Sequence, residues 1–388
     1  MMMAGAILLM TGCSADDVVM ETTSERAVAI SFSCNYDDQE ENTTRAGYEG
    51  MMNTEDLCTT GFGVMASVTA DKMPTLMYNQ QVEFTLVGDL GDPKKGYWSY
   101  SPTKYWPNSI TNLYISAYAP YVDPADLVSL PADETGIYGI SANNEVPYVD
   151  YRRCEKPNKQ VDLLWYYEEP TAIPAGTAQQ AAGTVAMKMH HALARLELKV
   201  ALATAPASGT KVLIEKITLT GKMAKTGRLS LSSQETVIEN EGTEDEVTKY
   251  YPVWSNQVFD KDGGGEDIDH SFQITNEDNA PESYGIIESQ VRYIPGLPYA
   301  WQPDGLKAYD AEAEDKGFLN ALNTGDRKGY IYLIPQSTLS LTVKVKYHKM
   351  TSLSDVVGEK TTTVTPTTVA NPLKGNTTYT LSLKLSDI

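Results

Sequence analysis

The chain contains few of the side chains that most often perform catalysis or bind metal ions. Its 388 residues include four histidines and four cysteines, and neither a Cys-x-x-Cys pair nor a cluster of Cys and His occurs. The motifs Gly-x-Ser-x-Gly and His-Glu-x-x-His are missing, as are phosphate-binding and dinucleotide-binding glycine loops. We therefore expect that the protein is not an enzyme and that it has no catalytic residue, no metal site and no cofactor.

Positive charge is also scarce. The chain has 31 Lys and Arg against 51 Asp and Glu, which gives a formal net charge of −20. Proteins that bind nucleic acid need clustered Lys and Arg to neutralise the phosphates. The charge balance therefore argues against a nucleic-acid partner and suits a soluble, self-repelling surface protein.

Long hydrophobic runs are missing, except for a short one near the N-terminus that ends in Leu9-Met10-Thr11-Gly12-Cys13. A bilayer-spanning helix needs about 20 apolar residues, and this run has roughly half that number. An apolar segment that closes on small residues and a cysteine has the form of a lipobox. We therefore expect residues 1–12 to be a lipoprotein signal peptide and Cys13 to carry the lipid, for example palmitate.

Apolar residues at helical spacing are rare, whereas alternation with period two is common, which predicts an all-β protein. One alternating segment, residues 27–36, places four apolar residues on one face: Val28, Ile30, Phe32 and Cys34. A second alternating segment near the C-terminus has the apolar residues Tyr379, Leu381, Leu383 and Leu385. Each pattern is typical of a strand with one face in a core and the other in water.

The alternation changes phase between residues 185 and 200. The odd-numbered residues of 185–189 are apolar, whereas in 196–200 the even-numbered residues are apolar. A β-bulge or a kink between two sheets produces such a shift. The Pro/Gly/Ala-rich stretch 170–183 before it has no periodicity, and we expect it to connect an N-terminal domain (46–183) to a C-terminal domain (184–388).

Residues 13–45 are predicted to be a propeptide that contains one removable strand. The strand contributes Val28, Ile30 and Phe32 to a core and is flanked by acidic stretches. After it, Arg45 stands in a polar, Thr-rich stretch before Ala46, which suits cleavage by a trypsin-like, Arg-specific protease. Cleavage there would release the lipid and the strand together. Alternatively, residues 14–45 are a lipoprotein tether with an incidental strand.

Removal of the strand would leave an apolar slot at a sheet edge. Each exposed apolar side chain is worth about 1.5–3 kcal/mol when buried, and a strand from a neighbouring chain can restore that burial. The candidate donor strand contains Tyr379, Leu381, Leu383 and Leu385, and the Thr/Val-rich segment 360–369 is a second candidate. A head-to-tail contact that does not close on itself builds a fibre from copies of one chain.

Two further features leave alternatives open. Cys58 and Cys154 could pair in an oxidising compartment, but their spacing does not indicate contact, so two thiols are an equal alternative. The acidic segment 260–267 looks like a calcium loop but lacks the ligands expected at the fifth and twelfth positions. A solvated hairpin loop is the preferred interpretation.

Several motifs together resemble the fimbrillin-like lipoproteins of Bacteroidetes, the FimA/Mfa-type or type V pilins. The lipobox with Cys13 and the following Ser14-Ala15-Asp16-Asp17 resemble their surface-export signal, and Thr44-Arg45-Ala46 resembles their maturation site. The other matching segments, in chain order, are Tyr105-Trp106-Pro107, residues 113–120, Val161-Asp162-Leu163-Leu164, residues 189–196 and residues 375–381.

The resemblance implies two tandem transthyretin-like β-sandwich domains and polymerisation by strand exchange into surface fimbriae for adhesion. It implies an outer-membrane, surface-exposed location and partners that include other copies or related fimbrial subunits. A glycan or protein receptor is also expected. The alternatives are a tip, accessory or anchor subunit of the same fold, or a surface glycan-binding lipoprotein, for which the aromatic segments 97–100 and 165–167 are the candidate contacts.

Overall fold

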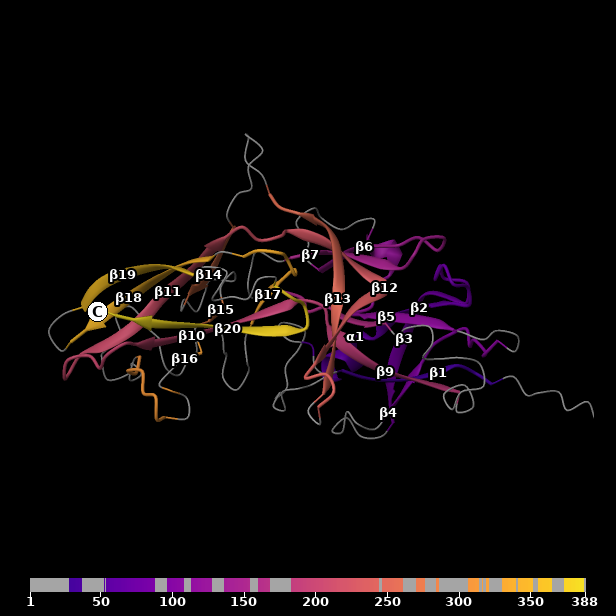
Figure 1. Cartoon of the computed structure of the whole chain (residues 1–388), viewed down its shortest axis with the longest axis horizontal. Helices are drawn as coiled ribbons and strands as arrows, with labels where there is room; N and C mark the ends of the chain where they lie inside the picture. The colour runs from indigo at the N-terminus through magenta and orange to yellow at the C-terminus, as the bar shows by residue number, and fades with distance from the viewer. Residues whose placement is uncertain are drawn as a thin grey trace, which may run out of the picture.

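β-Strands make up almost all of the regular structure in the computed structural model of the chain (Figure 1). The two helices of the described residues, α1 (Thr54–Thr60) and α2 (Pro124–Leu127), are short, and neither could span a bilayer. The prediction of an all-β protein is confirmed. The structure describes residues 28–36, 52, 54–87, 96–107, 113–127, 136–153, 160–167, 183–243, 246–260, 270–275, 284–285, 306–313, 316, 319–320, 330–339, 341–351, 355–364 and 373–386.

A seven-stranded sheet contains most of the strands that precede residue 192. From one edge to the other it consists of β1 (Ser31–Tyr36), β9 (Thr184–His191), β8 (Leu164–Tyr167), β5 (Tyr114–Ala119), β2 (Phe62–Ser67), β3 (Met77–Leu86) and β4 (Gly96–Ser99). Strands β2 and β8 are buried on both faces, because alternate residues enter two different cores. Val64, for example, lies in one core and its neighbour Met65 in the other.

A four-stranded antiparallel sheet covers one of these faces. Its strands, in spatial order, are β13 (Val247–Val258), β12 (Thr226–Glu239), β7 (Tyr148–Arg152) and β6 (Gly136–Ile140). Val149, Tyr151 and Leu229 point from it into a core shared with Trp165 and Tyr118 of the seven-stranded sheet. These two sheets therefore form one β-sandwich.

A second β-sandwich lies at the other end of the molecule (Figure 1). One of its sheets is built on β10 (Ala194–Leu202), which pairs with β16 (Leu319–Asn320), β17 (Ile331–Leu333) and β20 (Thr377–Leu385). The other sheet consists, in spatial order, of β15 (Tyr284–Gly285), β14 (His270–Thr275), β11 (Lys211–Gly221), β18 (Leu341–Met350) and β19 (Asp355–Val364). Buried Leu, Ile and Val residues of β10, β11, β18 and β20 fill the space between them.

The predicted change of phase marks the passage of the chain from one sandwich to the other. Strand β9 ends at His191 in the seven-stranded sheet, and β10 begins at Ala194 in the other sandwich. Ala192 and Leu193 between them are fully buried. The prediction of a kink between two sheets is confirmed.

Strand pairing crosses the predicted domain boundary at residue 184 in two sheets. β9 lies on the C-terminal side of that boundary but pairs with β1 and β8, and β12 pairs with β7. Strands from both sides of the boundary therefore share two sheets, and the division into 46–183 and 184–388 stays a prediction.

Candidate functional site: the two terminal strands

Strand β1 lies at the edge of the seven-stranded sheet, where β9 is its one partner among the described strands (Figure 1). The two strands are parallel, with Ser31 opposite Thr184 and Tyr36 opposite Met189. An edge strand takes part in a single ladder of hydrogen bonds, so its departure leaves the other strands paired. β1 can therefore leave without dividing the sheet.

The side chains of β1 and the residue before it are part of the core. Ile30 and Phe32 are almost completely buried, and Cys34 packs partly buried against the same cluster. The Phe32 ring lies edge-on to Phe62, with 6.2 Å between centroids, and 5.4 Å from the ring of Tyr100. Burial of two such side chains contributes about 3–6 kcal/mol. The predicted core contacts of Ile30 and Phe32 are confirmed.

Polar contacts fix the beginning of β1. The amide of Ile30 donates to the carbonyl of Lys104 at 2.9 Å, and the Tyr100 hydroxyl donates to the carbonyl of Ile30 at 2.8 Å. The Ser31 hydroxyl donates to the carbonyl of Gly183 at 2.8 Å. Burial raises the pKa of Tyr100, which keeps this phenol a hydrogen-bond donor. The partners all lie far along the chain from β1.

Val28 does not share the buried face, contrary to the prediction. Its side chain is 39% exposed, whereas that of Ile30 is 2% exposed. The ladder with β9 begins only at Ser31, and the chain before it forms a bridge from Ala29 to Tyr105. Val28 therefore lies beyond the end of the β9 ladder, and the core-facing residues are Ile30, Phe32 and Cys34.

The C-terminal strand β20 occupies a comparable place in the other sandwich. It is parallel to β10, with Thr377 opposite Ala194 and Leu385 opposite Leu202. Three leucines of the candidate donor strand, Leu381, Leu383 and Leu385, are buried, and Tyr379 packs against their cluster. In this structure the candidate donor strand is therefore seated in its own chain.

A tight turn positions the beginning of β20. A Cβ atom at Gly375 would collide with the carbonyl of Ala192 and the ring of Pro252, so this close approach requires glycine. Asn376 follows with a positive φ of 53°, and its amide donates to the carbonyl of Leu193 at 3.2 Å. The turn thereby joins β20 to the kink between β9 and β10.

β1 and β20 are edge strands that pair with β9 and β10, two strands separated by only Ala192 and Leu193. The β1 ladder ends at Met189 and the β20 ladder begins at Ala194, and both outer strands run in the same direction as their partners. Core residues are opposite core residues in both cases, as Phe32 is opposite Val185 and Leu381 is opposite Leu198. The two terminal strands are therefore alike in direction and in side-chain phase.

A buried pair, Asp162 and His191, holds the kink. His191 Nδ1 lies 2.7 Å from Asp162 Oδ2, and both side chains are almost wholly buried. Oδ1 accepts from the amide of Leu163 at 2.8 Å, and Oδ2 also accepts from the amide of Met52 at 3.0 Å. Burial by itself would raise the pKa of Asp162, but the charge of His191 and its hydrogen bond outweigh it, so this pKa is lowered.

The Asp162–His191 pair was not predicted. The sequence offered its two halves separately, as the segments 161–164 and 189–196, and gave no sign that they meet. Through Met52 the pair also holds the chain just after the predicted cleavage site, so it positions the beginning of the body that would remain.

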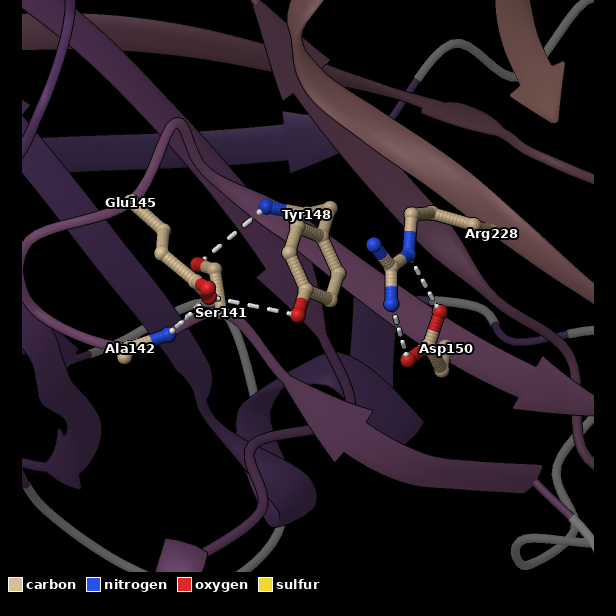
Figure 2. A network of polar contacts seen from close by, with 6 residues as sticks. All are labelled: Ser141, Ala142, Glu145, Tyr148, Asp150 and Arg228. Carbon is tan, nitrogen blue, oxygen red and sulfur yellow. Dashed lines mark hydrogen bonds and ion pairs between the residues drawn. The ribbon is translucent and has the colours of Figure 1, made fainter. Parts of the chain in front are cut away.

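A network of polar contacts links the β6–β7 turn, β7 and β12 on the β13-β12-β7-β6 sheet (Figure 2). Arg228 donates from two nitrogens to the two carboxylate oxygens of Asp150, at 2.7 and 2.9 Å, and its guanidinium lies 3.5 Å from the ring centroid of Tyr148. Glu145 accepts from the amide of Ala142 at 2.9 Å and from the Tyr148 hydroxyl at 3.3 Å. The hydrogen bonds with Asp150 raise the pKa of Arg228. The network fastens the β6–β7 turn to β12.

The aromatic segments considered as sugar contacts are mostly occupied with packing. Trp165, Tyr166 and Tyr167 are buried. Trp98 packs on Phe62 and Phe84 with centroids 4.8 and 5.0 Å apart, so that in the segment 97–100 only Tyr97, at 55%, ranks among the exposed large hydrophobic residues. These aromatics therefore do not form an open stacking surface.

Several predicted site residues lie outside the described part of the chain: Cys13, Arg45, Ala46, Cys154 and most of the acidic loop 260–267. Among the residues that the structure does describe, no group of three or more His, Cys, Asp or Glu could hold a metal ion. Cys34 and Cys58 are not in disulfides.

A family model described as fimbrillin-like matches residues 44–277, more than half of the chain. The chain belongs to the fimbrillin-like family. The predicted resemblance is thus confirmed, although no curated protein matches the chain.

Proteins of known structure are similar to this fimbrillin-like chain over most of its length. A fimbrial protein from Bacteroides vulgatus is 18% identical with a TM-score of 0.53, over 92% of this chain and 95% of that one. A candidate cell adhesion protein from Bacteroides ovatus is 13% identical with a TM-score of 0.38, over 92% of each chain. At 18% identity, the likeness to the Bacteroides vulgatus protein concerns the fold alone.

The buried ring of Phe32 should stabilise the uncleaved chain. We expect Phe32→Ala to lower the free energy of unfolding by about 3–5 kcal/mol, because it removes a buried aromatic ring and leaves a cavity. Val28→Ala, at the exposed neighbouring position, should change it by less than about 0.5 kcal/mol. Urea unfolding of the two variants measures the difference, and equal effects would contradict the placement of β1.

Asp162 should stabilise the fold at neutral pH and lose that effect in acid. We expect Asp162→Asn to cost about 3–5 kcal/mol at pH 7, because it breaks a buried pair. The folded-state pKa of Asp162 lies below its unfolded value of about 3.9, so its contribution is present above that pH and is lost as the pH falls through the folded pKa.

Urea unfolding at pH 7 and pH 3 tests this expectation. The difference between wild type and Asp162→Asn should narrow at the lower pH, and Asp126→Asn, at an exposed position in α2, provides the control. A difference that stays constant between the two pH values would show that the charge of Asp162 does not matter.

Proposed function

We propose that this fimbrillin-like chain is a structural subunit of surface fimbriae. In this proposal the chain is exported as a lipoprotein with its lipid on Cys13 and is cleaved between Arg45 and Ala46 by an Arg-specific protease. A strand from another copy then replaces β1, and repetition of this exchange builds the fibre at the outer membrane. The fibre serves adhesion by binding a glycan or protein receptor.

One observation carries the proposal: β1 and its partners lie on opposite sides of Arg45 in the sequence. Ile30 and Phe32 come before Arg45, whereas Phe62, Tyr100 and the whole of β9 come after it. A cut at Arg45 would therefore separate a buried strand from everything that buries it. The remaining body would keep the acceptors at Lys104 and Gly183 for an incoming strand.

β20 supports the second half of the proposal. It runs parallel to the strand it pairs with, as β1 does, and its apolar residues alternate with the same phase. Donation would remove Leu381, Leu383 and Leu385 from their own core, so the burial gained in the slot offsets burial lost at β10. The segment 360–369, which begins within the edge strand β19, stays the second candidate donor.

The Bacteroides vulgatus protein of similar fold is a fimbrial protein, which agrees with a fimbrial role for this chain. The packing of the aromatic segments argues for a subunit of the fibre body over a glycan-binding lipoprotein.

Arg45→Ala should abolish cleavage and fibre formation. We expect the variant to accumulate as a lipidated monomer, because β1 stays in its slot and excludes an incoming strand. Arg26→Ala is the matched control, since Arg26 precedes β1 and a cut there would leave β1 attached. Intact mass and N-terminal sequencing of sheared surface material measure the outcome, and normal fibres from Arg45→Ala would refute the proposal.

A disulfide that locks β20 to β10 should identify the donor. Glu197 and Thr380 are opposite each other, and the Thr380 hydroxyl donates to Glu197 Oε2 at 2.9 Å. In the double variant Glu197→Cys/Thr380→Cys, made with Cys58→Ser so that the engineered pair alone is locked, we expect oxidation to leave cleavage at Arg45 intact but to block fibres, and reduction to restore them. Each single variant is the control. Fibres formed with the lock closed would exclude β20 and favour the segment 360–369.

A further inference from the structure

Two cysteines lie on opposite sides of the predicted cleavage site and belong to the same part of the fold. Cys34 is on β1, before Arg45, and Cys58 is in α1, after it. Neither side chain is fully exposed, and neither is in a disulfide. A covalent link between them would therefore join the removable strand to the body that remains after cleavage.

Packing brings β1 and the end of α1 to the same core. Cys34 packs against a cluster that includes Leu57, the residue before Cys58, and Met187, the residue opposite Cys34 on β9. Just beyond α1, the Phe62 ring packs on Phe32, two residues before Cys34. The Leu57 carbonyl accepts from the Gly61 amide at 2.9 Å, which fixes the turn from α1 into β2.

The electrostatics of Cys34 agree with this proximity. Burial raises the pKa of the Cys34 thiol, and the neighbouring Cys58 raises it further. The raised pKa keeps Cys34 a neutral thiol at neutral pH, so its reaction should be faster in alkaline solution. Joining two thiols in a disulfide also requires an oxidant.

We propose that Cys34 and Cys58 are a cross-linking site, at which an oxidised disulfide holds β1 in its slot after the backbone has been cut. The oxidant is an external disulfide. One thiolate attacks it and releases the first external thiol, and the second cysteine then displaces the second external thiol to form the Cys34–Cys58 bond. Two thiols are oxidised, one external disulfide is reduced to two thiols, and two protons balance the thiolates.

The cross-link would make release of β1 depend on reduction as well as on proteolysis. This consequence rests on the proposed function, since it requires that β1 leaves after cleavage at Arg45. The cross-link itself does not depend on that function.

Peptide mapping tests the cross-link. The full exported chain is incubated with oxidised glutathione at pH 8, the remaining thiols are alkylated, and trypsin digestion follows without reductant. Cys34 then lies in peptide 27–45, Cys58 in 46–72 and Cys154 in a peptide that begins after Arg153. We expect peptides 27–45 and 46–72 to appear as one disulfide-linked species that separates on reduction.

Substitutions provide the controls. Cys34→Ser and Cys58→Ser should each abolish the linked species, whereas Cys154→Ser should retain it. Cys34 lies on β1 and is partly buried, so a folding defect of β1 would obscure the result for Cys34→Ser. Cys58→Ser avoids this problem because Cys58 lies in α1. Alkylated peptides 27–45 and 46–72 in the wild-type chain, or a link from Cys58 to Cys154, would overturn the proposal.

Limited trypsin cleavage at Arg45 of the folded chain then separates the two proposals. On a non-reducing gel, the fragment that ends at Arg45 should stay attached to the oxidised chain. Addition of reductant should increase the amount of released fragment at least tenfold. A linked species whose fragment stays bound after reduction supports the cross-link and counts against strand removal. Release of the fragment from the oxidised chain overturns the cross-link.

Discussion

The chain passes directly from one sandwich to the other between β9 and β10, and the rest of the structure depends on this constraint. β9 and β10 are separated by two buried residues, Ala192 and Leu193, and each strand carries one terminal strand of the chain. Because the alternation changes phase here, the apolar side chains of β9 enter one core and those of β10 enter the other. Asp162 fixes the point of change through His191, and the Ala192 amide donates to the Leu163 carbonyl beside it at 2.7 Å.

In the proposed function, the position of β1 would let cleavage prepare the protein for assembly. The precursor folds with Ile30 and Phe32 in place, which adds burial of about 3–6 kcal/mol to a fold whose total stability is of the order of 5–15 kcal/mol. If β1 is removed after folding, the remaining body loses this stabilisation, although the stabilisation was present when the body folded. In the proposed function, a strand with the same direction and phase as β1 would replace the missing contacts.

Local patterns in the sequence were enough to predict much of the fold. The alternation of residues 379–385 predicted β20. The shift of the apolar residues from odd to even positions predicted the kink before β10. Both predictions were possible because a strand with one buried face has apolar residues at every second position. Val28 was placed wrongly because alternation does not say where a ladder ends. The Asp162–His191 pair and the sharing of sheets across residue 184 depend on contacts between distant segments, which periodicity does not contain.

The parallel direction of β1 and β20 has a mechanical consequence. When two parallel strands are pulled past each other along their length, the evenly spaced hydrogen bonds of the ladder are strained together, whereas a hairpin opened from its ends breaks one bond at a time. A fibre whose subunits are joined along β9 would meet tension by shear. Its resistance to flow would then come from the slow rate at which a whole ladder yields.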